Sequence, residues 1–85
     1  MAATLTLRYF AAIREAIGVG SEAHATDAAT LGALRDELIA RGGAHADALA
    51  RTRAVRMAVD QVLSSEDAVL SGAREVAFFP PVTGG

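Results

Sequence analysis

The chain has 85 residues, 52% of them hydrophobic and 21% charged, which predicts one small domain that folds by itself and has no large internal active site. Its eight basic residues are all arginine and face ten acidic residues, and the resulting net charge of -2 excludes the basic surface that nucleic-acid binding needs. The absence of cysteine excludes disulfides, thiolate metal sites and a persulfide carried on a side chain.

The first part of the chain predicts two strands separated by a short helix. Thr4–Tyr9 alternates apolar and polar residues, as a half-buried strand does. The period then changes to that of a helix ending at Gly18, whose apolar face is formed by Phe10, Ile13 and Ile17. The weakly apolar segment 19–26 predicts a strand that returns beside the first, at an edge of the sheet.

The middle of the chain predicts the main helix. Thr30 is a typical N-cap residue, and Gly42–Gly43 ends the helix. The core-facing residues at helical spacing are Leu31, Leu34 and Leu38. The residues expected to face water are Arg35, Asp36 and Arg41. Residues 44–50 could form another short helical turn, but they give no firm pattern and are predicted to be a connection.

The last part predicts three strands. Val55–Val59 alternates again, and after the turn at Asp60–Gln61 a short return strand begins at Val62–Leu63. Glu75–Phe79 is an apolar strand that ends at a proline. The predicted fold is therefore α+β, a mixed sheet curled over one main helix, which is the β-grasp arrangement. We assign residues 1–79 to this domain and 80–85 to an extended tail.

The tail has a composition of its own. Pro80 and Pro81 fix their backbone angles and favour extended conformations, so the chain should leave the sheet as a stiff extension. Gly84 and Gly85 lack Cβ atoms and would fit a narrow channel, with the terminal carboxylate open to attack. A carboxylate needs activation, for instance as an acyl-adenylate, before a sulfur donor converts it into a thiocarboxylate. A frayed terminus without function is the alternative that these residues leave open.

Four segments resemble one family, in the family's order. The C-terminal decamer Val76–Gly85 (VAFFPPVTGG), in which Val82 and Thr83 join the prolines to the glycines, closely resembles the signature of the molybdopterin synthase small subunit family. The further segments are Leu7–Gly18 (LRYFAAIREAIG), Thr30–Arg35 (TLGALR) and Met57–Leu63 (MAVDQVL). Asp60 stands where the family usually has Asn, and Ser71–Arg74 replaces its Asp-Gly-Asp turn. These departures concern turn geometry and not the tail.

The resemblance implies a ubiquitin-like β-grasp fold and a sulfur-carrier function. A ubiquitin-activating-type adenylyltransferase would use ATP and Mg²⁺ to adenylate Gly85, and a cysteine desulfurase or rhodanese-like protein would supply sulfur. The thiocarboxylate on Gly85 would then enter the large molybdopterin synthase subunit and give sulfur to cyclic pyranopterin monophosphate, forming the dithiolene of molybdopterin. The family assembly is a heterotetramer of two small and two large subunits. Catalytic acid and base residues would lie in the large subunit, and the chain itself would hold no cofactor stably.

Two apolar residues are candidate partner contacts. If Val76 and Phe78 pack on the helix, Phe79 points to the opposite face, beside the tail. Leu63 follows a polar turn and is the second candidate, because clustered exposed apolar groups mark interfaces. The arginines that could pair with acidic residues of the activating enzyme are Arg8, Arg53, Arg56 and Arg74. A solvated arginine face is the more common role for each of them.

Other motifs point away from metal, hydrolase and membrane functions. His24 and His45 have neither ligand spacing nor companion cysteines, so we expect surface histidines and no metal site. The serines lack a nucleophile elbow and a base, so a hydrolase triad has no support. Met1–Arg8 does not read as a secretory leader, and no apolar run approaches the ~20 residues of a membrane span. We expect a cytoplasmic protein.

Three alternatives stay open on the sequence. Another sulfur carrier, such as the thiamine-pathway type, would use the same chemistry with a different acceptor, although the segment Phe78–Pro81 argues against it. A ubiquitin-like protein modifier would end with Gly85 in an isopeptide bond to a target lysine. A purely structural binding module would not need the Gly-Gly tail, and deleting Gly85 would then be harmless.

Overall fold

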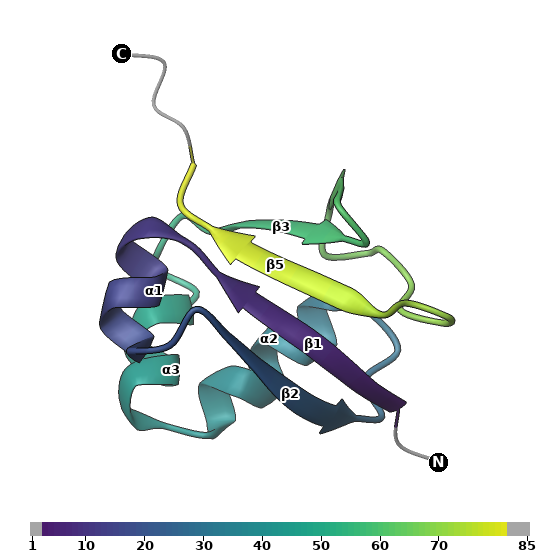
Figure 1. Ribbon diagram of the computed structural model, residues 1–85, viewed down its shortest axis with the longest axis horizontal. Coiled ribbons are helices and arrows are strands. Elements are labelled where there is room, and N and C mark those ends of the chain that lie inside the picture. Colours follow the sequence, from purple (N-terminus) through teal and green to yellow (C-terminus); the bar gives the residue numbers. More distant parts are fainter. Residues whose placement is uncertain (1–2, 82–85) are drawn as a thin grey trace.

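The computed structural model describes residues 3–81, which form a curved sheet with three helices packed against one face (Figure 1). The strands are β1 (Ala3–Tyr9), β2 (Ser21–Thr26), β3 (Arg56–Val59), β4 (Val62–Ser64) and β5 (Glu75–Phe79). The helices are α1 (Ala11–Ile17), α2 (Leu31–Ala40) and α3 (Gly43–Leu49). The strand order is β2-β1-β5-β3-β4, with β1 and β5 parallel and the other pairs antiparallel. This is the predicted α+β β-grasp arrangement.

The sheet core follows from the alternation of the strands. Leu5, Leu7 and Tyr9 on β1 are at most 1% exposed, whereas the residues between them face solvent. Val76 and Phe78 on β5 are completely buried beside them, because β1 and β5 run in parallel register. The first and last strands therefore meet at the centre of the sheet, and β2 is an edge strand as predicted.

The main helix α2 begins and packs as predicted. The Thr30 side chain accepts a hydrogen bond from the Ala33 backbone N–H at 3.2 Å, which caps one of the free donors of the first turn. Leu31, Leu34 and Leu38 are completely buried against the sheet. No helix among residues 3–81 has the length and apolar character that crossing a lipid bilayer requires.

Helix α1 differs from its prediction at its first residue. Phe10 is not part of the buried helical face but precedes the helix in an extended conformation, with 43% of its side chain surface exposed. Ile13 is buried as expected. Gly18 closes the helix with a φ of 95°, a left-handed conformation that glycine adopts without strain, and its N–H donates to the Arg14 carbonyl at 2.8 Å.

The segment predicted as a connection is largely the helix α3. Ala48 and Leu49 at its end are buried in the core. A seven-residue helix with only two buried residues has too little apolar periodicity to stand out in sequence. Tertiary packing against α1 and α2, and not local propensity, explains why it forms.

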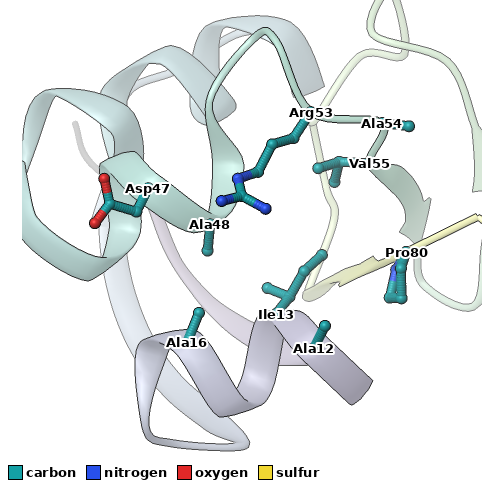
Figure 2. A pocket seen from close by; sticks show the side chains of 9 residues that line it. All are labelled: Ala12, Ile13, Ala16, Asp47, Ala48, Arg53, Ala54, Val55 and Pro80. Carbon is teal, nitrogen blue, oxygen red and sulfur yellow. The ribbon is translucent and has the colours of Figure 1, made fainter.

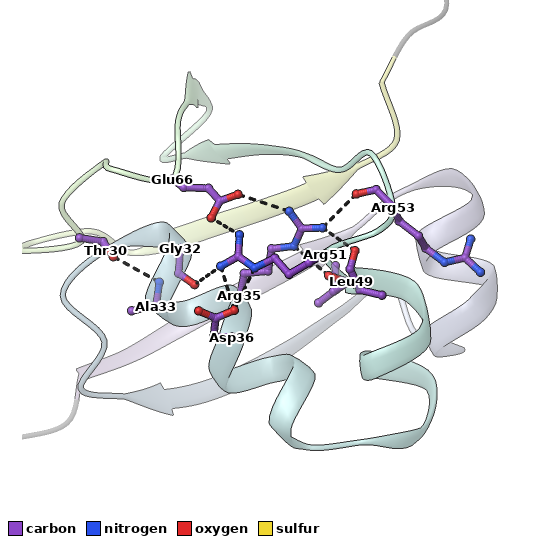
Figure 3. A network of polar contacts seen from close by, with 10 residues as sticks. Thr30, Gly32, Ala33, Arg35, Asp36, Leu49, Arg51, Arg53 and Glu66 are labelled. Carbon is purple, nitrogen blue, oxygen red and sulfur yellow. Dashed lines mark hydrogen bonds and ion pairs between the residues drawn. The ribbon is translucent and has the colours of Figure 1, made fainter.

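Arg35 was predicted to face water, and that prediction was wrong: the side chain is buried, at 4% exposure. Its guanidinium donates to three backbone carbonyls, those of Leu49 and Ala50 at 2.8 Å and that of Arg53 at 3.1 Å (Figure 3). Burial and the nearby Arg51 cation lower the pKa of Arg35, but these acceptors satisfy its donors. The arginine thus fixes the chain that follows α3.

The two histidines are not open surface residues either. The His24 Nε2 lies 2.6 Å from the Glu37 carboxylate, and its side chain is 14% exposed. The His45 Nε2 lies 2.7 Å from the Glu22 carboxylate, with 15% exposure. The sequence predicted surface positions because both glutamates are far from their histidines along the chain. Each pair attaches the edge strand β2 to a helix.

Glu22 is the centre of this edge cluster. Its carboxylate also accepts from the Tyr9 hydroxyl at 2.6 Å and from Arg41 at 3.2 Å. Burial alone would raise the pKa of the Glu22 carboxyl, but the hydrogen bonds from His45, Tyr9 and Arg41 outweigh it and lower the pKa to about 2. Burial and the bond to Glu22 raise the pKa of Tyr9, whose ring stacks on Phe78.

Candidate functional site

The candidate site lies where the tail leaves the sheet. Strand β5 is bonded to β1 on one side and β3 on the other, and the Phe10 N–H donates to the Phe78 carbonyl at 3.1 Å near its end. Pro80 then follows, without an N–H for a further ladder bond. The tail is therefore attached to the central strand. Pro80 and Pro81 are partly exposed, while the other predicted tail residues, Val82, Thr83, Gly84 and Gly85, lie outside the described residues.

The alternation of β5 places Phe79 on the outer face of the sheet. Val76 and Phe78 point to the helices and are completely buried, whereas Ala77 and Phe79 point the other way and are partly exposed. Phe79 adjoins Pro80 directly, so an apolar ring stands at the base of the tail on the side away from the core.

The outer face is hollowed next to Phe79. Arg8, Ala77, Ala58 and Leu63 pair in register across β1, β5, β3 and β4, so they form one row over the sheet. The two central members of the row are alanines, which leave a depression of about 370 Å³ between the larger side chains. We call this depression the sheet-face hollow. It brings the two predicted contact residues, Phe79 and Leu63, to one surface.

Phe10 also lines the sheet-face hollow, and sequence reasoning missed it. The Arg8 guanidinium carbon lies 5.7 Å from the centre of the Phe10 ring, which holds the aromatic side chain beside the hollow. Leu63 is 60% exposed on the other side. The missed signal is a period of two: Arg8 faces outward, so an extended residue at position 10 faces outward too.

The four candidate arginines do not form one surface. Arg8 lies in the sheet-face hollow and pairs with the Glu75 carboxylate at 3.5 Å, so its charge is partly balanced. Arg56 is in register with Phe79 near the tail. Arg74 precedes β5 at the end opposite the tail, and Arg53 lies in the segment that joins α3 to β3.

The Asp60–Gln61 turn positions the strand that carries Leu63. Both residues have positive φ angles, 47° and 70°, as the twist of a two-residue hairpin requires. The Asp60 carboxylate accepts from the backbone N–H groups of Arg74 and Glu75, each at 3.0 Å. Asp60 therefore also fixes the start of β5.

This chain resembles known proteins in both sequence and fold. The sequence matches the ThiS family over residues 7–85, nearly the whole chain. The chain belongs to the ThiS family. It is 43% identical to the molybdopterin synthase sulfur carrier subunit of Escherichia coli (strain K12), over 91% of this chain and 94% of that protein. It is 38% identical to the protein of the same name from Haemophilus influenzae, over 95% of this chain and 99% of that one. The predicted family is confirmed.

Solved structures confirm the ubiquitin-like fold of this ThiS-family chain. The crystal structure of SAMP1 from Haloferax volcanii superposes with a TM-score of 0.74 at 24% identity, covering 98% of this chain and all of that one. The solution structure of the Haloferax volcanii HVO 2177 protein gives 0.75 at 28% identity, covering 99% of this chain and 88% of that one.

The described part of this ThiS-family site is a partly apolar depression at the base of the tail. Its large side chains are the apolar Phe10, Leu63 and Phe79, together with Gln61 and the Arg8–Glu75 ion pair. Within residues 3–81 no three His, Cys, Asp or Glu side chains gather where a metal ion could bind. Apolar side chains around the start of a tail suit the docking of a protein that receives that tail.

Proposed function

We propose that this chain is the sulfur-carrier subunit of a molybdopterin synthase and that Gly85 carries the sulfur as a thiocarboxylate. The observation that supports this most is the 43% identity to the Escherichia coli sulfur carrier subunit over 91% of the chain. The family match also extends through Gly85, the residue that would react. In this role the chain is a cosubstrate that a partner acts on.

Activation comes first, because a carboxylate is a poor electrophile. In the proposed cycle the Gly85 carboxylate attacks the α-phosphorus of ATP on a ubiquitin-activating-type enzyme, so that a C–O–P bond forms and pyrophosphate leaves. A persulfide on a cysteine desulfurase or rhodanese-like donor attacks the acyl carbon and expels AMP. A second thiol of the donor reduces the acyl disulfide, leaving the thiocarboxylate and a donor disulfide. ATP and Mg²⁺ belong to the activating enzyme.

Sulfur delivery follows in the large subunit. The thiocarboxylate sulfur attacks an electrophilic carbon of cyclic pyranopterin monophosphate, and water hydrolyses the resulting thioester. The sulfur stays on the product, and the Gly85 carboxylate is regenerated. A dithiolene holds two sulfurs, so two carrier molecules that bear a thiocarboxylate are consumed for each molybdopterin. The large subunit supplies the positioning and the acid and base groups.

The geometry supports docking of that large subunit at the sheet-face hollow. Phe79, Leu63 and Phe10 offer apolar contact area beside the tail, and partly exposed aromatic residues often carry interface affinity. Pro80 and Pro81 would keep the tail directed away from the sheet. We propose a cytoplasmic heterotetramer of two small and two large subunits as the working assembly.

The test changes the length and width of the tail. We expect one alanine added after Gly85, or Gly84→Leu, to abolish molybdopterin formation in a reconstitution with the large subunit, because neither variant presents Gly85 in a narrow channel. The free energy of unfolding should not change. One alanine added before Met1 is the control and should leave activity intact. An extended variant that still forms molybdopterin would refute the proposal.

The protein-modifier role can be distinguished from the sulfur-carrier role with the same protein preparation. An isopeptide bond between Gly85 and lysines of other proteins would appear as slower-migrating adducts in a western blot. Our proposal predicts thiocarboxylate and no accumulation of such adducts. The likeness to SAMP1 shows the fold alone, at 24% identity.

A further inference from the structure

A second depression adjoins the tail on the helical side of the molecule. It has a volume of about 360 Å³ and lies between α1, α3 and the chain that leads into β3 (Figure 2). Ala12 and Ala16 on α1 face Ala48 on α3, and Pro80 closes one end. We call it the inter-helix groove. Pro80 is the first residue of the tail, so the tail begins at the rim of the groove.

The groove is preformed by well-packed walls. Ile13 and Ala48 at its base are each 5% exposed and belong to the core. The third wall, the chain from Arg53 to Val55, follows the segment whose carbonyls the buried Arg35 binds. Because one of these hydrogen bonds holds the Arg53 carbonyl and the other two hold the backbone just before this wall, a partner would meet the groove at a small ordering cost.

Arg53 gives the groove a positive charge. Its side chain is exposed and extends toward Ala48 and Ile13, whereas the Asp47 carboxylate points away from these side chains (Figure 2). Within residues 3–81 the Arg53 guanidinium forms no ion pair, although Arg8, Arg35, Arg41 and Arg51 each do. An apolar groove with one unbalanced cation suits a segment that carries both an apolar side chain and a carboxylate.

The groove and the sheet-face hollow flank the same short stretch of chain. Phe79 lines the hollow and Pro80, the next residue, lines the groove. Directly after the neighbouring strand β1, Phe10 lines the hollow, and Ala12 in helix α1 lines the groove. A protein that surrounds the emerging tail therefore meets both depressions, one on each side.

We propose that the large molybdopterin synthase subunit contacts the inter-helix groove as well as the sheet-face hollow, filling the groove with an apolar side chain and placing a carboxylate against Arg53. This inference rests on the proposed function. The large subunit is the occupant because the relatives' name, a synthase subunit, implies a companion subunit. The carrier would then be held from both sides while its tail is inserted.

The first test reverses the charge in the groove. In calorimetric titrations with the large subunit, Arg53→Glu should weaken binding about tenfold or more, because it places two carboxylates together. Arg74→Glu makes the same charge change at the far end of β5 and should alter the affinity by less than about twofold. Arg53 forms its internal hydrogen bonds only through its backbone N–H and carbonyl, so Arg53→Glu should fold normally.

The second test fills the groove without changing charge. Ala16→Phe should weaken binding about fivefold or more, because the added ring occupies the space of the partner's side chain. Ala33→Phe puts the same ring on an exposed alanine of α2 that does not line the groove and is the control for added bulk. The proposal requires both effects. If either Arg53→Glu or Ala16→Phe binds like wild type, the groove is not a contact surface.

Sulfur loading separates this inference from the proposed function. Wild type and both variants are incubated with the activating enzyme, ATP and a sulfur source, and thiocarboxylate on Gly85 is measured. Normal loading together with unchanged affinity of the groove variants would overturn the groove alone. No loading of the wild type would overturn the sulfur-carrier proposal itself.

Discussion

Each face of β5 carries one phenylalanine, and the two rings have different surroundings. On the inner face Phe78 is completely buried and stacks on Tyr9, with ring centres 6.0 Å apart. On the outer face Phe79, the next residue, is partly exposed beside Leu63 and Phe10. Adjacent phenylalanines thus belong to separate surfaces, the inner one for stability and the outer one, in our proposal, for the partner.

The largest expected effect tests the inner face. Phe78→Ala should lower the free energy of unfolding by about 3–5 kcal/mol, because it opens a cavity in a fully packed core. Phe79→Ala removes the same atoms from the outer face and should cost about 1 kcal/mol or less. Urea denaturation of both variants measures the difference. Equal destabilisation would contradict the division between the faces.

The next effect concerns binding by the outer face. Phe79→Arg should weaken the affinity for the large subunit by about 2 kcal/mol, roughly 30-fold, because a charge replaces an apolar contact. The free energy of unfolding should change little. Thr6→Arg adds the same charge on the outer face near the start of β5 and is the control for titration calorimetry. Unchanged affinity of Phe79→Arg would move Phe79 out of the interface.

A smaller effect is expected for the polar contacts of Glu22 at the edge of the sheet. Glu22→Gln should destabilise the fold by about 1 kcal/mol at neutral pH, because charged hydrogen bonds to Tyr9, His45 and Arg41 are weakened. Glu15→Gln, on the exposed side of α1, is the control. Stability of both proteins is measured by denaturation across pH.

The sign of that pH dependence follows from the pKa of Glu22. It is about 2 in the folded chain against the ordinary 4.5, so the carboxylate stabilises the fold above about pH 4.5. This contribution is lost as the pH falls from 4.5 toward 2. The stability gap between wild type and Glu22→Gln should therefore shrink over that interval. A gap that stays constant would show that the Glu22 charge has no role.

The smallest effect compares two exposed residues of one hairpin. Leu63→Ala should weaken binding to the large subunit by about 0.5–1 kcal/mol, a few-fold, because Leu63 lies at the edge of the sheet-face hollow. Val62→Ala is the control, since Val62 is 65% exposed but points to the other side of the strand. Similar losses for both variants would show that the hairpin contributes only through general packing.

Patterns among neighbouring residues were enough to predict several of the strands and the main helix. The alternation of Thr4–Tyr9 predicted β1, the apolar run Glu75–Phe79 before a proline predicted β5, and Thr30 with the following leucines predicted α2. The tail motif predicted the family. The outward direction of Phe79 followed from the alternation of side chains along any strand, so part of the candidate surface was visible before the fold.

Contacts between distant segments explain what the sequence did not reveal. Arg35 is buried among acceptor carbonyls that lie 14 to 18 residues further along the chain. A helical pattern cannot show such distant partners. Glu22 and His45 are 23 residues apart. The inter-helix groove depends on how α1 and α3 pack, and α3 itself gave no pattern.

The central claim is that Gly85 carries sulfur, and the most direct measurement is mass spectrometry of the C-terminal peptide. The chain is incubated with its activating enzyme, ATP and a sulfur source, and fragmentation localises any replacement of oxygen by sulfur, because oxidation of Met1 or Met57 gives nearly the same mass change. Our account predicts a thiocarboxylate on Gly85. Adenylation of Gly85 without any sulfur exchange would contradict it and favour attachment of Gly85 to other proteins.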